Sequence, residues 1–391
     1  MSHPFFNPLI ARDLSFATEV HFMVGQKLRE PAPLDGKRKW ACPANAQNPI
    51  DRILTEMTRV IDASTQEGCI KRGSEPRDET TVWEHEAPNK WLVTPSCRSW
   101  PGDQAPRGYK WHSFKLRSPF FSHQGFDAPP HTPHPFQRPL DLLQRDFLIH
   151  LNASTQFNVL VRLNSSCTDL TAAKRLVSLV WLFEKLFLVP LTPKQQINSG
   201  RALMVTENSK LAENSGNIFP QREVPVELRN THPRYKSRNS RLEKETSDIW
   251  KAQSVQELDL LMCRDEPPAR RGVPLAFSLI QAPEPATPAG HATWYAAFRY
   301  APWHSPDQYP LRATVPWLRV LFSIVAASQL TTFQFKQFAE DMLDHMLDLI
   351  RVRATEREYL GSIMRKLALS VDERNWRTIL DLYAEREAQR S

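Results

Sequence analysis

Two polar residues, Glu19 and His21, stand two positions apart in the segment 14–24, "LSFATEVHFMV". Side chains at positions i and i+2 of a β-strand point to the same face, so a carboxylate and an imidazole would lie side by side there. Such a pair can contribute ligands to a divalent cation. It also fits the solvated face of an amphipathic strand, and these two residues alone leave both interpretations open.

Other residue types that often bind metals or act as nucleophiles carry weaker signals. "HTPHP" at 131–135 holds two imidazoles, but the flanking prolines keep the backbone extended, so no metal site is expected there. The five cysteines are scattered and never form a CxxC pair, which predicts reduced thiols rather than a disulfide framework or a zinc site. No GxxxxGK[ST] or GxGxxG motif occurs, so neither a P-loop nor a Rossmann nucleotide site is indicated.

Alternating hydrophobicity predicts the strands that would position Glu19 and His21. In the segment 14–24, Phe16, Val20 and Phe22 share one face, whereas Glu19 and His21 lie on the other. Period-two or β-rich patterns predict four further strands, at 90–94, 113–121, 157–163 and 292–302.

Helical periodicity fills much of the remaining chain. In the segment 171–188, Leu176, Leu179, Val180, Phe183 and Phe187 follow the spacing of one helix face, and prolines end the run. Similar patterns predict helices at 315–328, 332–352 and 372–386. Because strands and helices do not alternate strictly, the sequence predicts an α+β fold with a largely antiparallel sheet.

Proline is frequent in this chain, with 32 prolines against 12 glycines. The stretches 25–90, 101–139 and 206–290 are polar and lack a continuous apolar face, so we expect long Pro-rich loops or partly disordered insertions there. Among them, 25–90 and 206–290 are expected to be variable loop insertions, and 315–391 a C-terminal helical part.

Charge and hydropathy narrow the partners and the compartment. The net charge is +7, but the basic residues are spread out, and the densest run, 229–241, includes a single aromatic residue, Tyr235. This pattern predicts a solvated loop rather than a nucleic-acid arm. The longest apolar run, 179–183, is far shorter than the roughly 20 residues of a membrane span, and the first residues lack the order of a signal peptide. We therefore expect a soluble cytoplasmic protein without nucleic-acid or membrane partners.

Six segments, taken together, resemble a known family. In chain order they are "FATEVHFMV", "WLVTPSCRS", "FKLRSPFFS", "FNVLVRL", "AAKRLVSLVWLFEKLF" with "LTPKQQIN", and "YAAFRYAP" followed by "WLRVLFSIVAAS". Their order and approximate spacing resemble the fungal amidoligase family of carboxylate–amine ligases, which is related to glutamine synthetase. The resemblance runs from about Leu14 to the final helices and implies a single domain over 1–391.

The resemblance implies both a fold and a reaction. The fold would be a glutamine synthetase-like core, an antiparallel sheet with one face lined by acidic and basic residues and helices packed on the other. The reaction would be ATP-dependent amide formation between a small-molecule carboxylate and an amine, through an acyl-phosphate. Carboxylates would hold Mg²⁺ on the ATP phosphates, and cationic groups would stabilise the transferred phosphoryl group.

Three residues match the positions of the family's motifs. Glu19 takes the place of the first Glu of a Glu-x-Glu strand, Asn198 that of the Asn after the helix, and Arg299 that of the Arg in the last strand. The resemblance therefore implies Glu19, Asn198 and Arg299 as the catalytic centre, with Glu19 also a metal ligand.

Other motif positions depart from the family pattern, and the changes add positive charge. His21 replaces the second Glu, Ser96 an Asp, Lys115 a Glu, and Arg162 an imidazole. The resemblance then assigns Lys115 and Arg162 to the binding of an anionic cofactor. Our hypothesis is that the chain keeps the amidoligase scaffold and that its metal-dependent ligation is weakened or lost. The alternative is a catalytically silent scaffold that binds an anionic ligand or a protein partner.

Overall fold

The structure is a computed structural model that describes most of the chain. The described residues are 14–29, 39–73, 89–97, 99–102, 105–122, 134–152, 155, 157–163, 170–192, 203–213, 222–234, 240–263, 275–281, 294–301, 303, 314–369 and 373–388.

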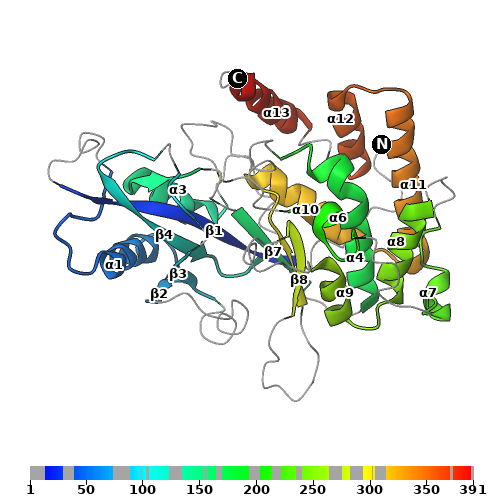
Figure 1. Cartoon of the computed structure of the whole chain (residues 1–391), viewed down its shortest axis with the longest axis horizontal. Helices are drawn as coiled ribbons and strands as arrows, with labels where there is room; N and C mark the ends of the chain where they lie inside the picture. The colour runs from blue at the N-terminus through cyan, green and yellow to red at the C-terminus, as the bar shows by residue number, and fades with distance from the viewer. Residues whose placement is uncertain are drawn as a thin grey trace, which may run out of the picture.

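The described strands form one mixed, mostly antiparallel sheet (Figure 1). Its order is β2-β3-β4-β1-β7-β9-β8, with β5 and β6 pairing with β1, and only the β2–β3 pair among them is parallel. The α+β class and the largely antiparallel sheet are thus confirmed. The strands are β1 (Leu14–Lys27), β2 (Cys69–Lys71), β3 (Trp91–Pro95), β4 (Tyr109–Arg117), β5 (Phe121–Ser122), β6 (Ile149–His150), β7 (Phe157–Leu163), β8 (Phe277–Gln281) and β9 (Trp294–Phe298).

Helices surround one end and one face of this sheet (Figure 1). The four helices predicted from periodicity are confirmed as α4 with its π-helical continuation η4, α10, α11 and α13. The described helices are α1 (Pro49–Asp62), α3 (Gln137–Asp146), α4 (Leu170–Phe183), η4 (Glu184–Leu188), α6 (Val205–Asn208), α7 (Val226–Arg229), α8 (Ser240–Lys251), α9 (Val255–Met262), α10 (Thr314–Ser328), α11 (Thr332–Arg351), α12 (Glu356–Lys366) and α13 (Glu373–Ala388).

The two faces of β1 have opposite characters, as the alternation predicts. Phe16, Val20 and Phe22 belong to the main hydrophobic core, to which α1, α3, α4 and α10 also contribute. Ala17 belongs to a small cluster on the other face, whose members among the described residues come from strands and from the residue after Pro119, not from helices. Glu19 and His21 share this second face with Ala17, and we call it the polar face.

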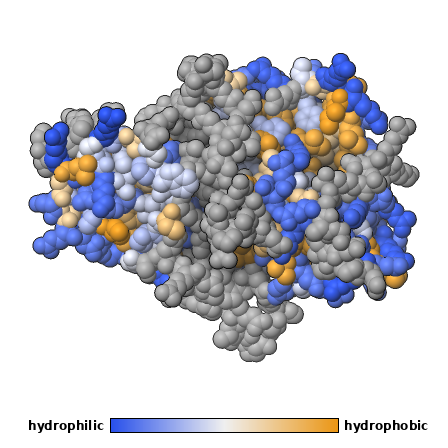
Figure 2. All heavy atoms as spheres, in the orientation of Figure 1, coloured by the Kyte–Doolittle hydropathy of each residue, from blue (hydrophilic) through white to orange (hydrophobic). Residues whose placement is uncertain are grey.

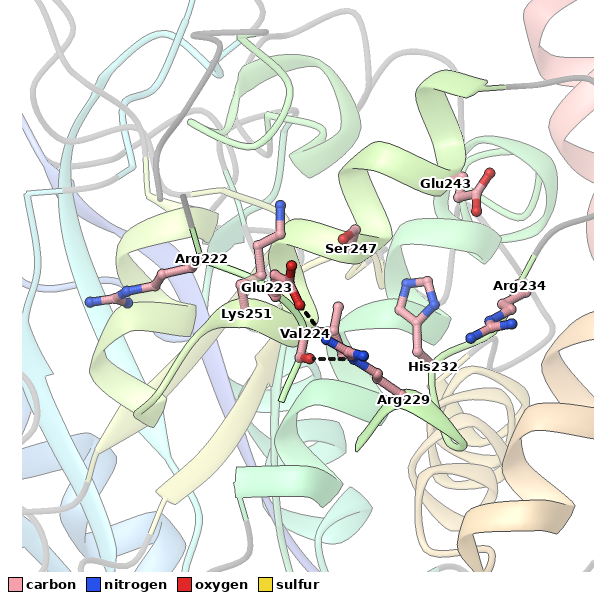
Figure 3. Close-up of a pocket in the computed structure, with 9 residues that line it drawn as sticks. All are labelled: Arg222, Glu223, Val224, Arg229, His232, Arg234, Glu243, Ser247 and Lys251. Carbon is pink, nitrogen blue, oxygen red and sulfur yellow. Dashed lines mark hydrogen bonds and ion pairs between the residues drawn. The ribbon is translucent and has the colours of Figure 1, made fainter. Parts of the chain in front are cut away.

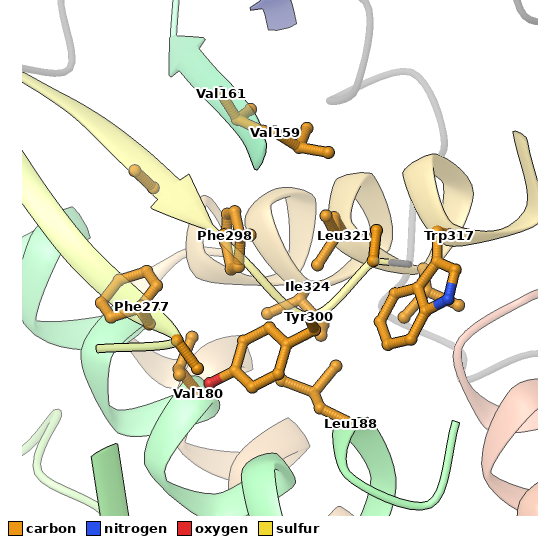
Figure 4. Close-up of a cluster of buried hydrophobic side chains, with 14 of the residues drawn as sticks. Val159, Val161, Val180, Leu188, Phe277, Phe298, Tyr300, Trp317, Leu321 and Ile324 are labelled. Carbon is orange, nitrogen blue, oxygen red and sulfur yellow. The ribbon is translucent and has the colours of Figure 1, made fainter. Parts of the chain in front are cut away.

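The core between the sheet and α4 and α10 is filled by large side chains (Figure 4). Every residue of α4 from Ala172 to Phe183 is buried, so this helix is internal and does not present a face to solvent. Side chains from three strands, α4, η4, α10 and the residue after Arg299 converge there, namely Val159, Val161, Val180, Leu188, Phe277, Phe298, Tyr300, Trp317, Leu321 and Ile324.

The strand predicted at 113–121 is displaced, because β4 covers Tyr109–Arg117. After Arg117 the backbone N–H of Ser118 donates to the carbonyl of Thr18 at 2.8 Å, and Pro119 has no N–H to continue a ladder. The chain pairs again with β1 only at Phe121–Ser122, as β5. The proline therefore splits one predicted strand into two.

The prediction of loops throughout 25–90 and 206–290 is wrong for several segments. Helix α1 lies in the first range, and α8, α9 and β8 lie in the second. In α1 a single apolar stripe, Ile53, Leu54, Met57 and Ile61, is buried among many charged residues. A narrow stripe at helical spacing suffices to fold such a segment against a sheet, even where the mean composition is polar.

Helix α1 begins with a cap that can be tested. The side chain of Asn48 accepts a hydrogen bond from the backbone N–H of Asp51 at 3.2 Å, and Pro49 occupies the first helical turn. We expect Asn48→Ala to lower the free energy of unfolding by about 1 kcal/mol, and Asn48→Gly by only a few tenths. Urea unfolding measures both, and equal losses for the two variants would contradict a capping role.

The surface visible in Figure 2 mixes hydrophilic and hydrophobic side chains over the described elements. Scattered apolar side chains are ordinary on soluble surfaces, so they assign no function. None of the helices in the described ranges combines the length and the apolar character needed to cross a bilayer.

Candidate functional site

The polar face places charged side chains from three adjacent strands next to one another. Glu19 of β1 lies directly opposite Arg117 of β4 and, on the other side, opposite Asn158 of β7. His21 lies opposite Lys115 in the same register. Since β1 is in the middle of the sheet, its carboxylate has neighbours from both sides.

Both oxygens of the Glu19 carboxylate accept hydrogen bonds. Oε2 accepts from Nε of Arg117 at 2.8 Å and from Nη2 of the same guanidinium at 2.5 Å. Oε1 accepts from Nδ2 of Asn158 at 2.9 Å and lies 3.0 Å from Nε2 of His21. An ionised carboxylate can only accept, so Nε2 of His21 carries a proton. Four donors therefore occupy the roughly four lone-pair positions of Glu19.

Electrostatics keeps this carboxylate ionised. Glu19 is only 3% exposed, and its burial by itself would raise the pKa. The charges of Arg117 and of Lys115, whose Nζ lies 3.9 Å from Oε2, together with the His21 hydrogen bond, outweigh burial and hold the pKa of Glu19 well below its ordinary value of 4.5. Glu19 is therefore an anion at neutral pH.

His21 connects the ion pair to the next strand but one. Its Nδ1 lies 3.2 Å from Oγ of Ser96, the residue directly after β3, and its side chain is fully buried. Ser96 is the residue that stands where the family resemblance expects an Asp. A hydroxyl can donate to the ring nitrogen or accept from it, so Ser96 orients the imidazole without adding negative charge.

Three of the four other predicted site residues lie on this face, and the fourth lies outside the described residues. Lys115 is buried beside Glu19, Arg162 shares the face of β7 that bears Asn158, and Arg299 follows β9 two positions after Ala297, which lies opposite Leu160. Asn198 lies outside the described residues. Glu19 is the one carboxylate in the described strands, so the cations on this face outnumber the carboxylates that the strands themselves supply.

Arg162 and Arg299 differ in how they are held. The guanidinium of Arg299 donates from Nη1 to the carbonyl of Leu275 at 2.9 Å and to Oγ of Ser278 at 3.0 Å, which fixes it against β8. The guanidinium of Arg162 stacks over the ring of Phe120, 4.5 Å from its centroid. The side chain of Arg162 makes no hydrogen bond with another residue of the described ranges. A stacked, partly buried guanidinium of this kind is suited to bind a carboxylate or phosphate.

Two functional candidates were missed from the sequence, Arg117 and Asn158. Arg117 stands two positions after Lys115, and Asn158 stands four positions before Arg162. Strand alternation therefore places each on the face of a residue that was singled out. The prediction followed the positions of the family's motifs and so passed over the two side chains that bind Glu19 most closely.

Two buried side-chain oxygen atoms on this face make no hydrogen bond with any residue in the described part of the chain. They are Oδ1 of Asn158 and Oγ1 of Thr94, which lies in β3 opposite Lys115. Buried polar atoms are nearly always satisfied, so such atoms often mark where water or a ligand binds. Because Nδ2 of Asn158 donates to Glu19, its Oδ1 must be the acceptor that is left over.

Within the described ranges, no group of three or more His, Cys, Asp or Glu side chains is placed to hold a metal ion. Comparison with known proteins gives no match for this chain to a family model, a curated protein or a solved structure. The amidoligase resemblance, the glutamine synthetase-like core, the roles of the site residues, and ATP and Mg²⁺ as cofactors thus stay predictions.

Proposed function

We propose that this chain is an amidoligase-like scaffold that binds a small anionic molecule directly on the polar face, without a metal ion. The ligand would carry a carboxylate or a phosphate group. Metal-dependent amide-bond formation, the reaction that the family resemblance implies, would be weakened or lost.

The observation that carries this proposal is the occupied carboxylate of Glu19. A magnesium ion requires oxygen ligands, and Glu19 offers its oxygens to Arg117, His21 and Asn158 instead. To bind Mg²⁺, Glu19 would have to give up a buried contact in which two N–H groups of Arg117 donate to its Oε2, and charge-assisted hydrogen bonds of this kind are among the stronger interactions in proteins. The surrounding cations favour an anion and oppose a metal ion.

Arg162 is the residue that we expect to contact the ligand. Its guanidinium is already oriented by Phe120, and the ring centroids of Phe120 and Tyr295 lie 6.3 Å apart. An oriented guanidinium loses little conformational entropy when it binds a carboxylate or phosphate. Both oxygens of such a group can accept from one arginine, which sets the geometry of recognition.

Isothermal titration with ATP, with and without Mg²⁺, and with glutamate and inorganic phosphate tests this function. We expect binding of at least one of these anions, of the same strength with and without Mg²⁺. In Arg162→Ala the affinity for that anion should fall by roughly 10- to 100-fold, because a charge-assisted hydrogen bond is lost.

The matched control is Arg351→Ala, since Arg351 is an exposed arginine of α11 that pairs with Asp348. It should bind like the wild type. Binding that appears only with Mg²⁺ would support the ligase instead, and binding of none of the three anions would refute the proposal.

A further inference from the structure

A pocket lies away from the polar face, among the segment 222–234 and the helix α8 (Figure 3). The segment 222–234, which includes α7, and the helix α8 line this pocket, which is open to the surface and has a volume of about 550 Å³. This size suits a small-molecule ligand. Part of the basic run 229–241, predicted to be a solvated loop, forms one wall of this cavity.

Cationic side chains outnumber carboxylates in the lining. It includes four cations, Arg222, Arg229, Arg234 and Lys251, and two carboxylates, Glu223 and Glu243. Figure 3 shows Arg229 and Glu223 in the middle of the cavity, with Lys251 above them on α8 and Arg234 to one side.

Three of these cations have carboxylate partners, and the two arginine pairs among them are easily exchanged. Arg229 pairs with Glu223, Arg222 with Glu257 at 2.9 Å, and Lys251 with Asp248 at 2.8 Å. The two arginine pairs are partly exposed to water, with 46% and 38% of the arginine side chains accessible, so their net stabilisation is small and an incoming anion can compete.

Arg234 is held by its backbone and not by its side chain. The backbone N–H donates to Oε1 of Glu340 at 3.0 Å, which fixes the position of the residue. Its exposed guanidinium makes no hydrogen bond or ion pair with another residue in the described ranges. An arginine with an anchored backbone and available donors is well suited to bind a ligand.

His232 lines the same pocket as a buried imidazole next to several cations. Its side chain is 7% exposed, lies edge-on to Trp250, and its Nε2 has no hydrogen-bond partner in the part of the chain that the structure describes. Burial first, then the charges of Arg234 on its own segment, Lys336 on α11 and Lys251 on α8, lower the pKa of His232 to about 4. The imidazole is therefore neutral at pH 7.

We infer that this cavity binds the phosphate group of a small molecule, held by Arg229, Arg234 and Lys251. A phosphate group, as mono- or dianion, accepts hydrogen bonds from several directions at once, which matches donors that come from two elements. The hydroxyl of Ser247 on α8 adds a neutral donor to the lining. The carboxylates of Glu223 and Glu243 and the concave shape disfavour an extended nucleic-acid backbone, which needs a continuous basic track.

His232 offers a readout inside the site. An anion bound among the cations that face this imidazole would favour its charged form, so phosphate should raise the pKa of His232 from about 4 to above about 5. Proton NMR of the histidine ring, titrated against pH with inorganic phosphate or with chloride at equal ionic strength, measures this. A pKa that is the same in both salts would overturn the inference.

Variants test which residues bind the phosphate. Arg234→Ala and Lys251→Ala should each weaken the binding of phosphate, measured by calorimetry, by about 5- to 20-fold, since each removes a charged donor. Arg351→Ala should leave it unchanged. Unchanged phosphate affinity in the double variant Arg234→Ala/Lys251→Ala, or tighter binding of an RNA oligonucleotide than of phosphate, would overturn the inference.

Phosphate binding in this pocket and anion binding on the polar face, the proposed function, can be refuted independently. Arg162→Ala removes a contact on the polar face, so it should leave the response of His232 to phosphate intact. If Arg162→Ala abolished that response, the phosphate would bind at the polar face and the cavity assignment would be wrong.

Discussion

The variant Glu19→Ala is expected to lose roughly 3–5 kcal/mol of unfolding free energy at pH 7. It removes the carboxylate that faces Arg117 and Lys115, two cations that are themselves buried. A buried charge that loses its partner is far more costly than an exposed one, because water cannot replace the interaction. Folded proteins are stable by only about 5–15 kcal/mol, so chemical denaturation should show a large shift of the midpoint.

A matched exposed ion pair provides the comparison. Oε1 of Glu207 lies 3.2 Å from Nζ of Lys185, and both side chains are about half exposed. Glu207→Ala should cost at most about 1 kcal/mol. A similarly small cost for Glu19→Ala would show that the ion pair on the polar face contributes little to folding. If that variant also lost a Mg²⁺-dependent binding of ATP, Glu19 would be a metal ligand after all.

The effect of the isosteric variant Glu19→Gln on the free energy of unfolding should depend on pH. The pKa of Glu19 in the folded protein lies below its ordinary value of 4.5, so folding releases a proton from this group in mild acid. Its stabilisation is complete above about pH 4.5 and is lost as pH falls through the folded pKa. The difference in unfolding free energy between wild type and Glu19→Gln should therefore be constant from pH 7 to about 5 and shrink below.

Strand alternation is the part of the site that the sequence predicts well. The alternation of side chains along β1 places Glu19 and His21 on the face that points away from the main core, because one face of a central strand must be apolar. Lys115, Arg162 and Arg299 reach the same face for the same reason. Which cation touches Glu19 is a matter of register, and the structure sets Arg117 opposite it rather than Lys115. Register depends on pairing between segments about 100 residues apart, and no local pattern encodes it.

Composition misled the prediction where long polar stretches were taken as loops. In α1 the buried stripe occupies only one side of a charged helix, but Asn48 and Pro49 are a recognisable start signal that could have revealed it. The cavity beside α8 could not be found in this way. Its walls come from 222–234 and from α8, and only tertiary packing brings Arg229, Arg234 and Lys251 together.

The core face of the same strand should be as sensitive as its polar face. Phe16→Ala is expected to lose about 3–5 kcal/mol of unfolding free energy, because the cavity it leaves cannot close completely. The Phe16 side chain is fully buried, and its ring centroid lies 5.1 Å from that of Phe322 on α10 and 5.7 Å from that of Phe136 at the start of α3. Its loss would therefore loosen β1 from two helices at once.

Urea unfolding of Phe16→Ala, Phe16→Leu and Glu19→Ala separates packing from charge on this one strand. Phe16→Leu should recover more than half of the loss, since it restores most of the volume. The loss of unfolding free energy in Phe16→Ala should be the same at pH 7 and pH 4, whereas the loss in Glu19→Gln should be smaller at pH 4. Because the two side chains lie on opposite faces of the strand, the losses in Phe16→Ala/Glu19→Ala should add to within about 0.5 kcal/mol. Strong non-additivity would mean that the two faces of β1 are coupled through the strand, so that a ligand on the polar face could be sensed by the helices on the other side.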